Sequence, residues 1–168
     1  MSDQFEPLNR FLTDNNIAHF TAQELCKINR FSKPNKPFYN IPPENLWKNI
    51  LTTLYFAEFI REFFGPIRII SGYRSRENND RIPGTARRSK HILFKAIDCT
   101  PIKGDFKKFQ GFSRSFWKSA EIFRSEEIVW LAEHNVDPLC MSLGEYQKNR
   151  YIHVDFQADR LRHNHWIG

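Results

Sequence analysis

The sequence predicts an α+β fold in which helices precede a small, mainly antiparallel sheet. Two observations indicate this order: apolar residues recur at helical spacing in the first third of the chain, and short segments with alternating apolar and polar residues follow. With 168 residues, 16 Phe and four Trp, the chain can bury a substantial aromatic core. We expect one domain, 1–168.

The first predicted elements are helices. Thr21 and Glu24 have the spacing of a capping box, which predicts a short helix to about residue 29. Four prolines predict a loop over 30–43. Apolar residues at helical spacing predict a long helix over 44–64 that ends at Gly65.

The second half contains the predicted strands. Alternation or apolar runs favour strands at 67–71, 96–99, 141–146 and 151–156. The long loop 72–95 is unusual for a compact domain unless it has a function. We expect a connection over 104–111 and a mostly helical segment, in two pieces, over 116–133.

Three polar residues, His91, Asp98 and His153, form a candidate metal site. Two neutral imidazoles and one carboxylate, with water in a fourth position, can make a catalytic zinc site. On a helix, His91 and Asp98 would be separated by about 10.5 Å of rise, so a turn must bring them together. Two neighbouring strands could direct Asp98 and His153 into one cleft. The alternative is that all three are ordinary hydrogen-bonded core or surface groups.

The residues around these candidates form an ordered series that resembles a known family. The series comprises Ser71-Gly72-Tyr73-Arg74-Ser75 after a predicted strand, Asn79, Ile82-Pro83-Gly84, Ser89-Lys90-His91 with Asp98, and Tyr151-Ile152-His153-Val154-Asp155. It resembles the zinc D-alanyl-D-alanine carboxypeptidase family, which includes VanX-type dipeptidases and phage L-alanyl-D-glutamate endopeptidases and has hedgehog-type relatives. The chain is most similar to the short, single-domain members found in phages.

The resemblance implies a fold, a function and site residues. It implies zinc on His91, Asp98 and His153, a substrate carboxylate on Arg74, and Ser89 in or next to the site. A guanidinium can bind a carboxylate through two parallel hydrogen bonds, although Arg74 could equally brace a loop or form a surface ion pair. The implied function is a zinc-dependent peptidase that cleaves peptidoglycan stem peptides, as a D-Ala-D-Ala carboxypeptidase or an L-Ala-D-Glu-type endopeptidase, for example a viral endolysin or entry enzyme.

Two positions depart from the family pattern. Relatives usually have Gly three residues after the first ligand, where this chain has Phe94; because a bulky residue resists a left-handed backbone, we expect the loop to take another path. Many relatives carry the general base three residues before the last ligand, where this chain has Arg150. Asp155 is the first candidate for the base, or it orients a metal ligand or is structural. Glu145 is the second candidate.

Charge leaves two other classes of function open. The net charge is +6, and the loop before the first ligand is basic, with Arg74, Arg76, Arg81, Arg87, Arg88 and Lys90. Such a patch can bind nucleic-acid phosphates, attract the anionic bacterial wall or be a solvated face. The alternatives are a non-catalytic, zinc-containing wall-binding module and a basic nucleic-acid-binding protein. We expect a monomer whose partner is peptidoglycan rather than nucleic acid.

The remaining signals concern cellular context. Three scattered cysteines indicate neither a zinc finger nor a disulfide framework. No apolar stretch of 18 residues predicts a membrane span. The N-terminus does not resemble a secretory signal, so we expect synthesis in the cytoplasm and action on the wall after lysis or virion delivery. His163 and His165 could join a metal, but we expect them on a fraying tail.

Overall fold

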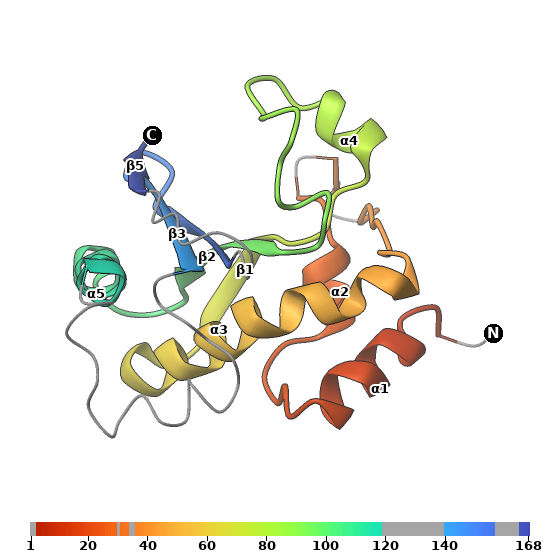
Figure 1. The fold of residues 1–168 in the computed structure, drawn as a ribbon, viewed down its shortest axis with the longest axis horizontal. Coiled ribbons are helices and arrows are strands. Elements are labelled where there is room, and N and C mark those ends of the chain that lie inside the picture. The colour runs from red at the N-terminus through yellow and green to blue at the C-terminus, as the bar shows by residue number, and fades with distance from the viewer. Residues whose placement is uncertain (1–2, 30, 34–35, 119–139, 157–164) are drawn as a thin grey trace.

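The computed structural model describes residues 3–29, 31–33, 36–118, 140–156 and 165–168 (Figure 1). Its elements are α1 (Glu6–Asp14), α2 (Ala22–Cys26), a 3-10 helix η1 (Glu44–Ile50), α3 (Leu51–Phe64), β1 (Ile67–Ser71), α4 (Arg76–Asp80), β2 (Ala96–Pro101), α5 (Phe106–Lys118), β3 (Met141–Tyr146), β4 (Tyr151–Phe156) and β5 (His165–Ile167). The predicted α+β class is confirmed. No helix in these described ranges is long and apolar enough to cross a membrane.

The strands form one sheet in the order β1-β2-β4-β3-β5. The first four strands pair antiparallel, and β5 pairs parallel with β3. In the β2–β4 pair, Asp98 lies directly opposite His153. Because directly paired residues place their side chains on the same face of a sheet, this register brings two of the candidate ligands together.

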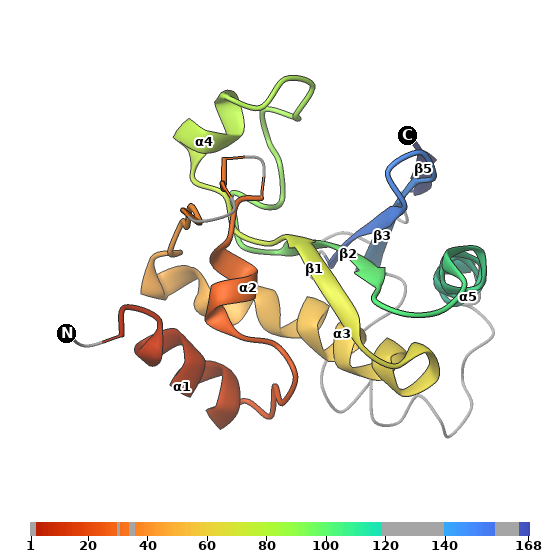
Figure 2. The ribbon, with the colours of Figure 1, turned by 180° about the vertical axis from the view of Figure 1, so that it is seen from behind.

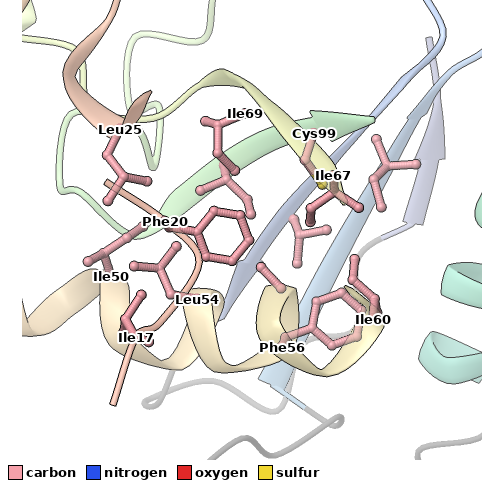
Figure 3. Packing of buried hydrophobic residues seen from close by; sticks show 14 of the residues in the cluster. Ile17, Phe20, Leu25, Ile50, Leu54, Phe56, Ile60, Ile67, Ile69 and Cys99 are labelled. Carbon is pink, nitrogen blue, oxygen red and sulfur yellow. The ribbon is translucent and has the colours of Figure 1, made fainter. Parts of the chain in front are cut away.

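Helix α3 covers one face of the sheet and leaves the other for the site. Figure 3 shows Leu54 and Ile60 of α3 pointing toward the strands, where they pack with Ile67, Ile69 and Cys99 in one buried cluster. Helix α4 and the loop that follows it lie on the opposite side of β1 and β2 from α3 (Figure 2). The alternation of apolar and polar residues along β2 and β4 therefore directs the polar face toward the loop that carries His91.

The local signals explain several elements. Thr21 caps α2: its hydroxyl accepts the backbone N–H of Glu24, and the Glu24 carboxylate accepts the N–H of Thr21, so the predicted capping box is confirmed. Helix α3 ends where predicted, at Gly65, whose φ of +67° lies in the left-handed region that favours glycine.

Other predictions of secondary structure were wrong. Residues 44–50 form a 3-10 helix, and the α-helix begins only at Leu51. The segment 104–111 is not a connection, because α5 begins at Phe106. The long loop 72–95 contains the short helix α4, which begins after Ser75; the Ser75 hydroxyl accepts the backbone N–H of Asn78. The predicted helical segment 116–133 lies outside the described residues beyond Lys118.

Candidate metal centre

His91, Asp98 and His153 lie together, as the sequence predicted. Asp98 Oδ1 is 2.8 Å from His153 Nδ1 and 3.3 Å from His91 Nε2, and the two imidazole nitrogens are 3.2 Å apart. All three side chains are buried. Within the described part of the chain they form the group of His, Cys, Asp or Glu residues whose ligand atoms are close enough to share one metal ion.

The remaining ring nitrogens have partners that orient both imidazoles. His91 Nδ1 donates to the carbonyl oxygen of Gly72 at 2.7 Å, and His153 Nε2 donates to Asp155 Oδ2 at 3.2 Å. With the protons assigned in this way, each ring presents its other nitrogen to Asp98 as a lone-pair donor. Partners of this kind fix the tautomer and the ring orientation of metal-binding histidines.

The electrostatics of the cluster favour a bound cation. Burial alone would raise the pKa of Asp98, but His91 and His153 hold that pKa well below its usual range. Burial lowers the pKa of His91. Burial would also lower the pKa of His153, but its contacts with Asp155 and Asp98 raise that pKa to about 9. A buried anionic Asp98 facing two nitrogen donors therefore needs a positive charge between them, and a divalent cation fits this donor set.

The turn that carries Arg74 is hydrogen-bonded to the loop that carries His91. The backbone N–H of Arg74 donates to the carbonyl of His91 at 3.3 Å, which complements the bond from His91 to Gly72. A side chain at Gly72 would place its Cβ 2.3 Å from the carbonyl oxygen of Leu25, so only glycine fits against α2 here. This close approach explains why the turn contains glycine.

A cleft of about 540 Å³ opens over the cluster. Its walls include Arg74, Ser89 and Lys90 on one chain segment and Tyr151 on β4, along with all three candidate ligands. The Arg74 side chain is only 8% exposed, and its buried Nε has no hydrogen-bond partner among the described residues. Burial lowers the pKa of Arg74, with Asp98, Tyr151 and Tyr146 acting in the opposite direction.

The two candidates for the general base lie in different places. Asp155 is 2% exposed, lines the cleft and contacts His153. Glu145 is paired with Ile152 in the sheet, which places it on the apolar face, away from the cluster. There it binds both Nε and a terminal nitrogen of Arg114. The structure thus brings Asp155 to the site and does not bring Glu145 there.

Arg150, at the position where many relatives have the base, also lies away from the cluster. It follows the turn between β3 and β4 with a φ of +54°, and its guanidinium lies 5.9 Å from the centre of the Phe106 ring. Among the described residues that line the cleft, the carboxylates are Asp98 and Asp155. A proton acceptor from this part of the chain must therefore be one of these two groups.

The expectation that Phe94 diverts the loop from a left-handed backbone was wrong. Phe94 itself has a φ of +52°, and its backbone N–H donates to the carbonyl of His91. The left-handed conformation costs about 1–2 kcal/mol for a residue with a Cβ. The Phe94 ring is fully buried and packs edge-to-face on Tyr73 at 5.8 Å. Burying a phenylalanine contributes about 1.5–3 kcal/mol, which offsets that cost.

The cleft also contains aromatic residues that sequence reasoning missed. Tyr146, Tyr151 and Trp166 line it, and the two tyrosine rings stack 4.5 Å apart. The alternation along β4 could have identified Tyr151, which shares a face with His153. Trp166 comes from β5, and no local pattern indicates its position. His165 was expected on a fraying tail but belongs to β5 and contacts Glu145, whereas His163 lies outside the described residues.

Comparison with known proteins agrees with this site. A family model described as Peptidase M15 matches residues 18–129, two thirds of the chain. The chain therefore belongs to the M15 peptidase family, a family of zinc-dependent enzymes that includes the VanX-like peptidases. The matched region contains Arg74, His91 and Asp98 but ends before His153, which the structure adds to the cluster. No curated protein matches the chain.

Proposed function

We propose that this protein is a zinc-dependent peptidase that cleaves peptidoglycan stem peptides, either as a D-Ala-D-Ala carboxypeptidase or as an L-Ala-D-Glu-type endopeptidase. The observation that carries the proposal is the buried His91–Asp98–His153 cluster at the base of a cleft in an M15 peptidase. As a setting we propose a viral lysis or entry enzyme that acts on the bacterial wall, and this part rests on the resemblance to phage members alone.

The three residues fit zinc and would leave a position open. Two imidazole nitrogens and one carboxylate oxygen are a ligand set of catalytic zinc sites, in which a water or the substrate takes the fourth position. A zinc ion held there supplies Lewis-acid activation of the scissile carbonyl and of a water molecule. His91 and His153 contribute because Gly72 and Asp155 hold their other nitrogens, so each ring keeps its donor nitrogen directed at the cluster.

Arg74 supports an anionic substrate. Its guanidinium is buried in the cleft wall with a polar atom that has no partner among the described residues. A buried donor without a partner is costly, so a ligand carboxylate that hydrogen-bonds to Arg74 would be strongly favoured. Arg88 and Lys90 line the same cleft and add positive charge that attracts such a ligand. Peptidoglycan stem peptides carry carboxylates of this kind.

Asp155 and Tyr151 are the groups we propose for handling protons. Asp155 is the cleft carboxylate that remains once Asp98 acts as a ligand, so we propose it as the proton acceptor as well as the group that orients His153. Burial raises the pKa of Tyr151 to about 12. Its phenol therefore stays protonated at neutral pH and can donate a hydrogen bond to a carbonyl oxygen in the cleft.

A non-catalytic, zinc-containing wall-binding module is the second candidate. The observation in its favour is that Arg150 occupies the position of the usual base, while the Asp155 carboxylate already accepts a hydrogen bond from His153. A protein of this kind would keep the metal and the Arg74 cleft but would hydrolyse nothing. The nucleic-acid alternative has only the net charge in its support.

Incubation with purified murein and zinc tests the proposal. We expect the wild type to release new amino groups, and the mass of the products identifies the bond that is cleaved. His91→Ala should release none, whereas His19→Ala should match the wild type because His19 is an exposed histidine that contacts Glu58 outside the cleft. If the wild type sediments with the wall yet releases nothing, the binding module is correct and the peptidase proposal fails.

A further inference from the structure

Strand β5 places two consecutive side chains on opposite faces of the sheet. His165 extends to Glu145 on the apolar face, and Trp166 lines the cleft on the other face. This alternation is what a strand dictates. The short C-terminal strand thus contacts both the structural side of the sheet and the candidate metal centre.

The apolar-face contacts fix the position of β5. Glu145 accepts hydrogen bonds from Arg114 of α5 and contacts His165, so one buried carboxylate connects α5, β3 and β5. The His165 ring also packs 4.9 Å from Trp117, and the backbone N–H of Gly168 donates to the carbonyl of Glu145 at 2.9 Å. With β5 fixed by these contacts, the indole of the next residue has a defined place.

On the cleft face, Trp166 packs against a candidate ligand. Its ring centre lies 5.4 Å from that of His153, and its indole N–H donates to the hydroxyl of Tyr146 at 3.1 Å. The ring also lies against Gly144, the residue paired with His153 in the sheet: a Cβ at Gly144 would be 2.5 Å from two ring carbons. Only glycine at this position lets the indole reach His153.

We infer that Trp166 is a positioning residue of the metal centre, which keeps the His153 ring in the orientation that presents Nδ1 to Asp98. The outer torsion of a histidine side chain is broad and roughly two-fold, so a single hydrogen bond to Asp155 leaves the ring room to turn. A large aromatic ring packed against the imidazole restricts that motion. This inference rests on the proposed function in one respect, because it presupposes that the cluster binds zinc.

Zinc affinity of the full chain, measured by competition with a chromogenic chelator and without any peptide substrate, tests the inference. We expect Trp166→Ala to weaken zinc binding by about tenfold or more, the size of effect that the loss of a partner orienting a ligand produces. Trp166→Phe should restore most of the affinity. Gly144→Ala, which removes no atom, should also weaken binding because its Cβ displaces the indole.

The double variant gives the sharpest result. In the Trp166→Ala background the added Cβ at position 144 meets no indole, so Gly144→Ala should cause no further loss of affinity, a non-additivity that reports a direct coupling. Trp47→Ala is the control, since Trp47 is also half-buried, donates to the carbonyl of Pro42 and packs on Phe11 outside the cleft. Its zinc affinity should match that of the wild type.

Unchanged zinc affinity in Trp166→Ala, or an equal effect of Gly144→Ala with and without Trp166, would overturn the inference. So would a lowered unfolding midpoint of the metal-free variants with normal zinc affinity, since this pattern indicates a purely structural role. Should Trp166→Ala fail to fold, Gly144→Ala and Trp166→Phe carry the same comparison. A wild type that binds zinc but cleaves no murein would defeat the proposed function and leave this result intact.

Discussion

Replacing Asp155 by Asn separates the two roles that we assign to this carboxylate. Asn keeps the shape of the side chain and can still accept a hydrogen bond from His153 Nε2, which lies 3.2 Å from Asp155 Oδ2 in the wild type. The negative charge is lost. A hydrogen bond to a charged group contributes about 1.5–3 kcal/mol and a neutral one about 0.5–1.5 kcal/mol. The difference of about 1–1.5 kcal/mol corresponds to roughly tenfold in zinc affinity.

The same variant tests proton transfer when zinc is saturating. If Asp155 accepts the proton, kcat on a synthetic stem peptide should fall by about 10²–10⁴ even with every site occupied, because a neutral amide cannot take up a proton. Asp105→Asn is the matched control: Asp105 is an exposed carboxylate that accepts the backbone N–H of Lys107 and does not line the cleft. Recovery of kcat at high zinc would refute the base role, and unchanged zinc affinity would refute the orienting role.

Three further predictions concern the substrate, the loop and the fold. Arg74→Lys keeps the charge but loses the two-point contact, so KM for the stem peptide should rise about tenfold or more with kcat little changed, and an unaltered KM would remove Arg74 from substrate binding. Phe94→Gly relieves about 1–2 kcal/mol of left-handed strain but deletes a fully buried ring whose loss costs about 3–5 kcal/mol, so urea unfolding of the metal-free protein should show a net loss of roughly 2–3 kcal/mol; a more stable variant would contradict the offset described above. Burial raises the pKa of Glu145, but Arg114 and His165 lower it overall, so the ionised group stabilises the fold above its ordinary value of 4.5. The stability difference between wild type and Glu145→Gln should therefore be constant near neutral pH and shrink as pH falls below 4.5, and a difference that does not change over that range would show that the ion pair does not stabilise the fold.

Local patterns predicted the parts of the fold that local interactions determine. The capping box at Thr21 and the helix end at Gly65 each depend on residues within a few positions. Period-two alternation placed Asp98 and His153 on the polar faces of β2 and β4, where the structure has them. The start of α5 was missed because Gly104 and Gly111 suggested a connection, although the buried Phe106, Phe109, Ser113 and Phe116 recur at helical spacing.

The rest of the site depends on which strands pair and in which register, and the sequence does not state this. Glu145 was a reasonable candidate for the base until its pairing with Ile152 placed it on the apolar face. Trp166 reaches the cleft only because β5 pairs parallel with β3. Phe94 shows the same limit for the backbone: its local preference opposes a positive φ, and burial of its ring in the tertiary structure decides the outcome.

Zinc content per chain tests the central claim most directly. The wild type, His91→Ala, His153→Ala and the control His19→Ala would be dialysed against limiting free zinc and analysed by atomic absorption. We predict one equivalent of zinc in the wild type and in His19→Ala, and none in the two cluster variants. A wild type without zinc, or a full equivalent retained by His91→Ala, would contradict a metal centre built from His91, Asp98 and His153.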